Sequence, residues 1–296
     1  MKTTVTATLA LLLTAFVLLP AQQLHREVKR SDEKEVRCRM ESSFGSVTVR
    51  KGNKDRIVSV TYKKKDRSDE ARLDLDYSVN KGTGDLRLDM HPKNSSRSSD
   101  DDGEDVHINA DMNFSTDTWY VEFAPGLPLS LEAELGAGKS DFDLSGLTIN
   151  DLSISTGASS SRLDFDERNS GEIRTLKIES GVSKFVANNL NNANFRKMEF
   201  DGGVGSYYLD FGGELKRDVK VDLNVGLGSM TVAVPRTIGL RIRYEDSWLS
   251  NLSLDDEEFV RKKKGVYESQ NYNTAEGKMD VSIESGLGTV KIKRTK

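Results

Sequence analysis

Two segments, Leu176-Lys-Ile178-Glu-Ser-Gly181 and Val281-Ser-Ile283-Glu-Ser-Gly286, show the pattern that decides the fold. In each, apolar residues lie five and three places before a glycine, and further apolar residues tend to follow it at even offsets. Six copies occur, with spacings between their glycines of 21, 24, 22, 23 and 60 residues. A period of about 22 residues with this alternation predicts an all-β solenoid of stacked repeats, each with two short strands joined at a glycine bend.

The bends themselves are rich in glycine. Four of the six copies read Gly-x-Gly, whereas the second and third copies have Ser159 and Ser183 at the second place. Stacked bends demand close backbone approach or a positive φ, which glycine alone tolerates easily. We therefore interpret ten residues as structural bend glycines: Gly136, Gly138, Gly157, Gly181, Gly203, Gly205, Gly226, Gly228, Gly286 and Gly288.

The composition is that of a folded, soluble chain. The 296 residues are 36% hydrophobic and 30% charged, with a formal net charge of −4. A mildly acidic protein has no general affinity for nucleic acid, so we expect no nucleic-acid partner. The single cysteine, Cys38, forms no internal disulfide, and its inward register position predicts a buried small hydrophobe.

Residues 1–21 have the features of a secretory signal peptide. Lys2 precedes an apolar run from Val5 to Leu19, and Ala21 is a small residue at a plausible cleavage point. The run is shorter than the roughly 20 residues of a membrane-spanning helix, although retention as an anchor is the alternative. No later stretch is apolar enough to span a membrane as a helix, so we expect a secreted or periplasmic protein without a stable membrane span after signal removal.

The remaining chain divides into segments by composition. Residues 22–34 are polar and predict a flexible lead-in. Residues 35–116 predict an N-terminal β-strand region, in which Val36 to Val49 is a weak extra copy of the repeat with Gly45 in place of the second glycine. Within that region, the acidic and serine-rich stretch 92–105 predicts a disordered loop. Residues 117–296 predict the solenoid, interrupted by an insertion at 236–277 whose aromatic residues we expect to cover one end of the array.

Carboxylates recur at fixed places in the repeat and form a candidate binding face. Asp143, Asp164 and Asp210 lie seven places after a bend glycine, and Glu134, Glu179 and Asp201 lie two places before one. Strands stack about 4.8 Å apart, so neighbouring carboxylates repel one another unless lysine, arginine or a bound cation screens them. The simpler interpretation is a solubilising surface; the functional one is a face that binds cations or glycans.

Motifs of catalysis and cofactor binding are missing from the sequence. Each Gly-x-Gly joins strand to strand, whereas a dinucleotide fingerprint opens a helix. His25, His91 and His107 are scattered without ligand spacing, and no serine lies in a G-x-S-x-G elbow. We therefore predict no enzyme, no catalytic residue, no metal site and no cofactor.

The order of these elements resembles a known family. The run Trp119-Tyr-Val-Glu-Phe-Ala-Pro-Gly-Leu-Pro, continuing to Gly136-Ala-Gly138, and the later Gly265-Val-Tyr-Glu-Ser and Gly286-Leu-Gly288 are similar to the bacterial toast-rack family. The resemblance spans roughly residues 117–296 and less of 35–116. It implies an envelope-located β-solenoid without known enzymatic activity, related to adhesin-like repeat proteins and to the extracytoplasmic domain of cell-wall antibiotic-response proteins.

The function that we predict is a non-catalytic binding or scaffold module of the cell envelope, with the envelope-stress response as one process in which it would act. The alternative is a carbohydrate-binding adhesin that uses the acidic solenoid face. The expected partner is an envelope protein or a surface glycan, and self-association through the edges of the array is a third possibility.

Overall fold

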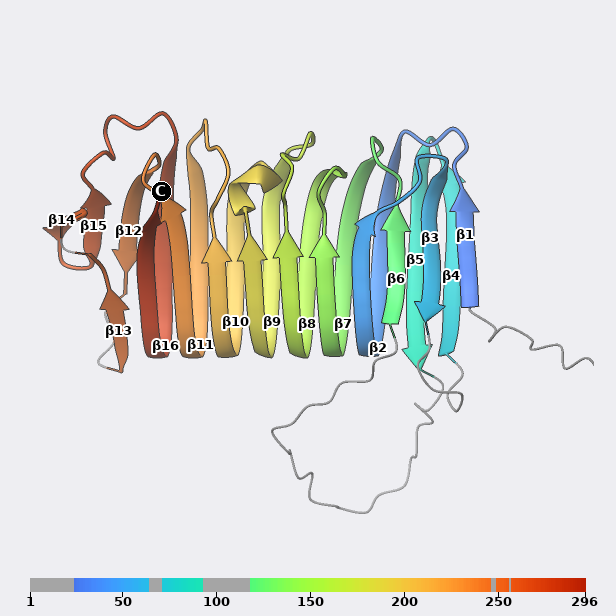
Figure 1. The fold of residues 1–296 in the computed structure, drawn as a ribbon, viewed down its shortest axis with the longest axis horizontal. Coiled ribbons are helices and arrows are strands. Elements are labelled where there is room, and N and C mark those ends of the chain that lie inside the picture. The colour runs from blue at the N-terminus through green and yellow to red at the C-terminus, as the bar shows by residue number, and fades with distance from the viewer. Residues whose placement is uncertain (1–23, 64–70, 93–117, 246–248, 256) are drawn as a thin grey trace, which may run out of the picture.

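Seven long parallel strands form the body of the protein (Figure 1). The computed structural model describes residues 24–63, 71–92, 118–245, 249–255 and 257–296. The signal peptide, nearly all of the 92–105 loop and Trp248 lie outside these residues. The seven strands are neighbours in chain order: β2 (Glu35–Lys51), β7 (Pro128–Asp143), β8 (Thr148–Asp164), β9 (Ile173–Asn188), β10 (Phe195–Asp210), β11 (Val219–Pro235) and β16 (Lys278–Thr295).

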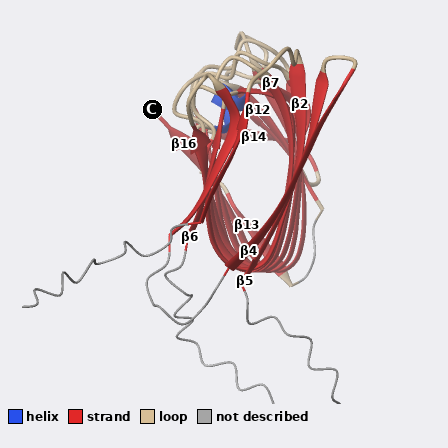
Figure 2. Cartoon of the chain, turned by 90° about the vertical axis from the view of Figure 1, so that its right-hand side faces the viewer, coloured by secondary structure: helices blue, strands red, loops and turns tan. Residues whose placement is uncertain are grey.

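Each long strand is bent into two arms at the first of its bend glycines, which are Gly136, Gly157, Gly181, Gly203, Gly226 and Gly286. We call the part before this glycine arm A and the part after it arm B; in β2 the corresponding residue is Ser43. Viewed along the solenoid, the arms form two layers that meet at one end, as Figure 2 shows. The sequence predicted two short strands per repeat, but pairing continues through the bend, with Gly202 opposite Ser180 and Val204 opposite Val182. The all-β, solenoid-like fold is confirmed, and its repeating unit is one bent strand.

Alternating side chains fill the space between the arms. In β9, Leu176 and Ile178 on arm A and Phe185 and Ala187 on arm B are all fully buried. The in-register parallel pairing places the equivalent residue of the next strand beside each of them. One continuous apolar core therefore runs the length of the solenoid.

The solenoid begins earlier in the chain than the sequence indicated. Arm A of β2 pairs with β5 (Thr83–Pro92), which pairs with β4 (Ala71–Asn80), while arm B pairs with β6 (Thr118–Phe123). β6 pairs in turn with β3 (Arg56–Lys63). Because β2 is a full member of the array, the described strands of the expected N-terminal region extend the two arms and form no separate unit.

The expected flexible lead-in at 22–34 is instead partly a strand. Leu24–Lys29 forms β1, which pairs antiparallel with β3. Without β1, one edge of β3 would leave its backbone N–H and C=O groups without hydrogen-bond partners. β1 provides those partners. Polar composition concealed this strand, because an edge strand with one exposed face needs few apolar side chains; here Leu24 and Val28 pack against the core.

The insertion at 236–277 covers the other end of the array. β12 (Gly239–Tyr244) pairs with arm A of β16, and β13 (Ser250–Ser253) pairs with arm B. β14 (Phe259–Lys263) and β15 (Val266–Ser269) form an antiparallel hairpin beside β12. Tyr244, Phe259 and Tyr272 are buried here, as expected of aromatic residues that close an end of the core.

Asparagines order the turns on the side opposite the bends. The connection between β9 and β10 contains the short 3₁₀ helix η1 (Leu190–Ala193), flanked by Asn189 and Asn194 with φ values of 55° and 59°. One turn earlier, the Asn169 side chain is buried; its Oδ1 accepts from the Ile149 N–H (2.9 Å), and its Nδ2 donates to the carbonyls of Ile149 (2.8 Å) and Ala193 (3.0 Å). These bonds join three successive turns.

At all ten predicted bend glycines a Cβ atom would meet the carbonyl oxygen of the preceding strand. At Gly138, where φ is +147°, the added carbon would overlap the oxygen of Gly45. Ser159 and Ser183 occupy the same place in β8 and β9 without a positive φ, and each donates or accepts a hydroxyl hydrogen bond within the bend. Close stacking is therefore the general requirement, and positive φ applies to only some repeats.

Comparing Gly45 with Gly138 separates these two effects. Gly45 has a φ of +116° but nothing within 4 Å of an added Cβ, because it lies in the first bend of the array. We expect Gly45→Ala to cost about 1 to 2 kcal/mol from φ strain alone. Gly138→Ala adds the steric overlap and should cost at least about 2 kcal/mol more. Urea unfolding followed by circular dichroism measures both; equal losses would contradict the stacking argument.

Candidate binding surfaces on the outer faces

The six candidate carboxylates do not form one face. Asp143, Asp164 and Asp210 lie on arm B, near the turns, whereas Glu134, Glu179 and Asp201 lie on arm A, beside the bend. The reason is geometric: residues before and after the bend glycine belong to opposite layers, so their outward side chains point away from each other. The sequence register gave both columns correctly as repeating positions but could not assign them to different layers.

The arm B carboxylates accept hydrogen bonds from their own turns and from the neighbouring repeat. Asp164 accepts a hydrogen bond from Asn188 Nδ2 (2.5 Å), and Asp143 Oδ1 accepts one from the Ser145 N–H (3.1 Å). Partial burial raises the pKa of Asp210, opposed by backbone hydrogen bonds from Asn189 and Gly212. These contacts are typical of turn structure.

Asp141, which the sequence analysis did not single out, is the arm B carboxylate whose charged form is disfavoured. The Asp141 side chain is exposed, but desolvation of its carboxyl group and then the negative charge of Asp164 raise its pKa, while Arg162 opposes the shift. Asp141 pairs in register with Arg162, and Arg162 lies 3.8 Å from Asp164. Asp141 lies two places before Asp143 in β7, so counting outward positions along the repeat would have identified it.

On arm A the carboxylates form one long column, and arginine and lysine side chains of the same layer pair with some of them. In register, Asp89, Glu41, Glu134, Ser155, Glu179, Asp201, Asn224 and Glu284 stand side by side from β5 to β16. Arg39 Nη2 donates to Glu134 (2.8 Å) and its Nε to Glu41 (2.9 Å), and Lys177 contacts Glu179 (2.6 Å). The charge of Glu134 is the main cause of the raised pKa of Arg39. The repulsion expected from sequence is thus partly offset by basic residues two places earlier in β2, β5 and β9, namely Arg39, Arg87 and Lys177.

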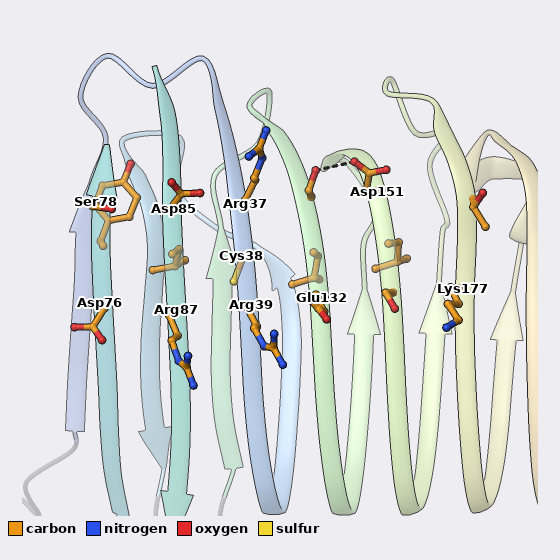
Figure 3. Close-up of a pocket in the computed structure, with 17 residues that line it drawn as sticks. Arg37, Cys38, Arg39, Asp76, Ser78, Asp85, Arg87, Glu132, Asp151 and Lys177 are labelled. Atoms are coloured by element: carbon orange, nitrogen blue, oxygen red, sulfur yellow. Dashed lines mark hydrogen bonds between the residues drawn. The ribbon is translucent and has the colours of Figure 1, made fainter. Parts of the chain in front are cut away.

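Beside this column, the outer face of arm A is hollowed into a groove of about 800 Å³ (Figure 3). The groove crosses β4, β5, β2, β7, β8 and β9. Its basic residues are Arg37, Arg39, Arg87 and Lys177, and its acidic residues are Asp76, Asp85, Glu132 and Asp151. Ser130 Oγ donates to Asp151 Oδ2 (3.0 Å), the contact drawn in Figure 3. Side chains from strands far apart in sequence, such as Arg87 and Lys177, thus line one surface.

Cys38 lies beneath this groove and is buried, as its register predicted. Burial alone raises the pKa of its thiol, so the reactive thiolate is disfavoured. Within the described residues, no three or more His, Cys, Asp or Glu side chains gather as they would around a metal ion. None of the helices in the same part of the chain has the length and apolar character needed to cross a membrane.

The architecture defines a class of repeat protein: a β-solenoid of bent parallel strands whose outer faces carry ordered rows of charge. The chain belongs to the toast-rack family, because the model described as "N-terminal domain of toast_rack, DUF2154" matches residues 20–188 and 174–233. The match extends further towards the N-terminus than the resemblance in sequence indicated, in agreement with β2 as the first full repeat.

Two solved structures match this chain over most of its length. A "putative cell adhesion protein" of Clostridium sporogenes is 18% identical, with a TM-score of 0.44 over 93% of this chain and 99% of that one. A "putative adhesin" of Bacteroides fragilis is 11% identical, with a TM-score of 0.35 over 92% and 98% of the respective chains. Among curated proteins, no sequence matches this chain.

Removing the Asp141 charge should stabilise the protein in a pH-dependent way. The raised pKa means that the folded state binds the Asp141 proton more tightly than the unfolded state does, so stability falls as pH rises through the acid range. We expect Asp141→Asn to raise the urea midpoint at pH 7 and to lose this advantage below the ordinary pKa of 3.8. The exposed Asp218, in the loop before β11, provides the control as Asp218→Asn. A gain of equal size at pH 7 and pH 3.5 would contradict the assignment.

Proposed function

We propose that this protein is a non-catalytic, extracytoplasmic binding module that holds an envelope protein against the arm A groove. The observation that carries the proposal is the groove itself, in which side chains of both signs from six strands face outward together. Membership of the toast-rack family supports an envelope location, as does the signal-like segment at 1–21.

The groove has the properties of a protein-binding surface. Arginine is enriched in protein interfaces because its planar guanidinium pairs with carboxylates and carbonyls in fixed geometry. Arg39 and Arg87 are ordered by Glu41, Glu134 and Asp89 at 2.8 to 3.5 Å and keep about half of their side-chain surface exposed. Since these side chains are already held in place, a partner would lose less conformational entropy on ordering them.

A glycan ligand is the second candidate, and the lining residues favour it less. Sugar rings commonly stack on exposed aromatic rings. Among the described residues that line the groove, the aromatic one is Tyr77, whose hydroxyl donates to Glu33 Oε1 (2.5 Å) and whose ring packs against the core. The carboxylates and hydroxyls of the groove would still hydrogen-bond a sugar, so an experiment must separate the two ligands.

Photocrosslinking from β8 tests the location of the partner. Ser153 lies in the groove on arm A, and Arg162 lies on arm B of the same strand. We expect a benzoylphenylalanine at position 153, but not at position 162, to give a discrete adduct with an envelope protein in cells. Equal adducts at both positions would contradict a specific groove, and an adduct with cell-wall polysaccharide alone would establish the glycan candidate.

Removing the two central arginines tests the chemistry of the groove. Because charged interface residues act mainly through direct pairing, Arg39→Ala with Arg87→Ala should lower the yield of the Ser153 adduct about tenfold. Arg162→Ala is the matched control on the opposite layer and should leave the yield unchanged. Melting temperatures of both variants show whether the fold is intact; an undiminished yield in the double variant would exclude these arginines from the contact.

A further inference from the structure

A row of exposed apolar side chains runs along the bends. They are the residues between the two bend positions of each strand: Phe44, Ala137, Ala158, Val182, Val204, Leu227 and Leu287. Each pairs in register with the next, from β2 to β16. We call this row the apolar ridge. At about 4.8 Å per strand, its six steps span about 29 Å.

The ridge is not part of the core. Phe44, Val182, Val204, Leu227 and Leu287 are 43% to 60% exposed, although a polar residue at the tip of the bend would be better solvated. Single exposed apolar residues are ordinary, whereas a contiguous row marks an interaction surface. All seven members are apolar, while the outward residues on both sides of the ridge are mostly polar or charged.

Two rows of unlike chemistry flank the ridge. On arm A, two places before the bend glycine, stands the acidic column that includes Glu134 and Glu179. On arm B, three places after it, stand hydroxyl residues together with Lys139 and Lys184, which form no ion pair within the described residues. Each lysine shares its strand with an acidic residue across the ridge: Glu134 with Lys139 in β7, and Glu179 with Lys184 in β9.

We propose that the ridge packs against the ridge of a second copy, with the two solenoid axes parallel. A two-fold axis along the ridge places the acidic column of one copy opposite the lysine and hydroxyl row of the other, strand by strand. Glu179 then faces Lys184 of the second copy, and Glu134 faces Lys139. A two-fold axis across the ridge would make the solenoids antiparallel and set acidic column against acidic column, which like charges disfavour.

The size of the surface predicts weak association. The six residues from one flanking row to the other, five steps apart, extend at most about 16 Å in strand geometry, so each copy would bury about 460 Å². The total of about 900 Å² is at the low end of specific interfaces. We therefore expect a dimer whose population depends on concentration in the micromolar range, and which leaves the arm A groove open.

Sedimentation equilibrium of the mature protein tests the association. We expect the mass to rise from monomer to dimer with concentration. Val204→Asp with Leu227→Asp should weaken the dimer at least tenfold, whereas Val79→Asp with Val260→Asp, which changes residues of 42% and 48% exposure away from the ridge, should not. A strict monomer at 500 µM, or equal effects of both pairs, would overturn the proposal. Flotation of the wild type with lipid vesicles, lost in the ridge variant only, would assign the ridge to a membrane instead.

Single cysteines distinguish the two orientations. In the parallel dimer each ridge residue faces its own copy, so Phe44→Cys and Leu287→Cys should each form a disulfide-linked homodimer. In the antiparallel dimer only a mixture of these two variants would crosslink, and that result would overturn the parallel arrangement. Buried Cys38 gives a low background, and wild type measures it.

A charge exchange tests the pairing of the flanking rows. Lys184→Glu should weaken the dimer, because it opposes Glu179 of the second copy. Lys184→Glu with Glu179→Lys restores opposite charges in both symmetric contacts and should recover wild-type association. Because Glu179 also contacts Lys177 in its own chain, melting temperatures must accompany these measurements. Failure of the double variant to recover association, in a protein with an unchanged melting temperature, would overturn the proposed contact.

Discussion

Close backbone contact at the stacked bends is the constraint on which the rest of the structure depends. Each bend glycine lies against the carbonyl oxygen of the preceding strand, so a repeat can stack only at one spacing and in one register. That register then continues through both arms, since a slip by one residue would turn every apolar side chain outward. The bend therefore determines the core, although it contributes little apolar surface itself.

In-register stacking also determines the outer surfaces. A residue type repeated at one offset becomes a row of identical neighbours about 4.8 Å apart. Carboxylates repeated in this way would repel one another, and in β2, β5 and β9 the chain places arginine or lysine one outward position before them, where Arg39 reaches Glu134 and Lys177 reaches Glu179. The same stacking concentrates apolar residues at the tip of the bend into a ridge. Rows of this kind give the protein several separate surfaces without any irregular loop.

The two ends of the solenoid are covered by different sets of strands. An open end exposes both the core and unpaired backbone groups. At the N-terminal end, β4 and β5 extend arm A while β6, β3 and β1 extend arm B. At the other end, the insertion supplies β12 and β13 to the two arms of β16 and adds a hairpin with buried aromatic residues. Both ends use segments that depart from the repeat, because a further identical repeat would only move the exposed edge.

The sequence by itself determined the repeat, the bend glycines and the inward residues, because these follow from local alternation and from the special backbone freedom of glycine. It also indicated that Cys38 is buried and that the insertion closes one end. It did not reveal β1, whose pairing depends on the distant β3, nor that the Asp143 and Glu134 columns lie on opposite layers. The arm A groove and the apolar ridge were likewise decided only by the tertiary structure, since both bring together side chains from different strands that adjoin solely because these strands pair in register.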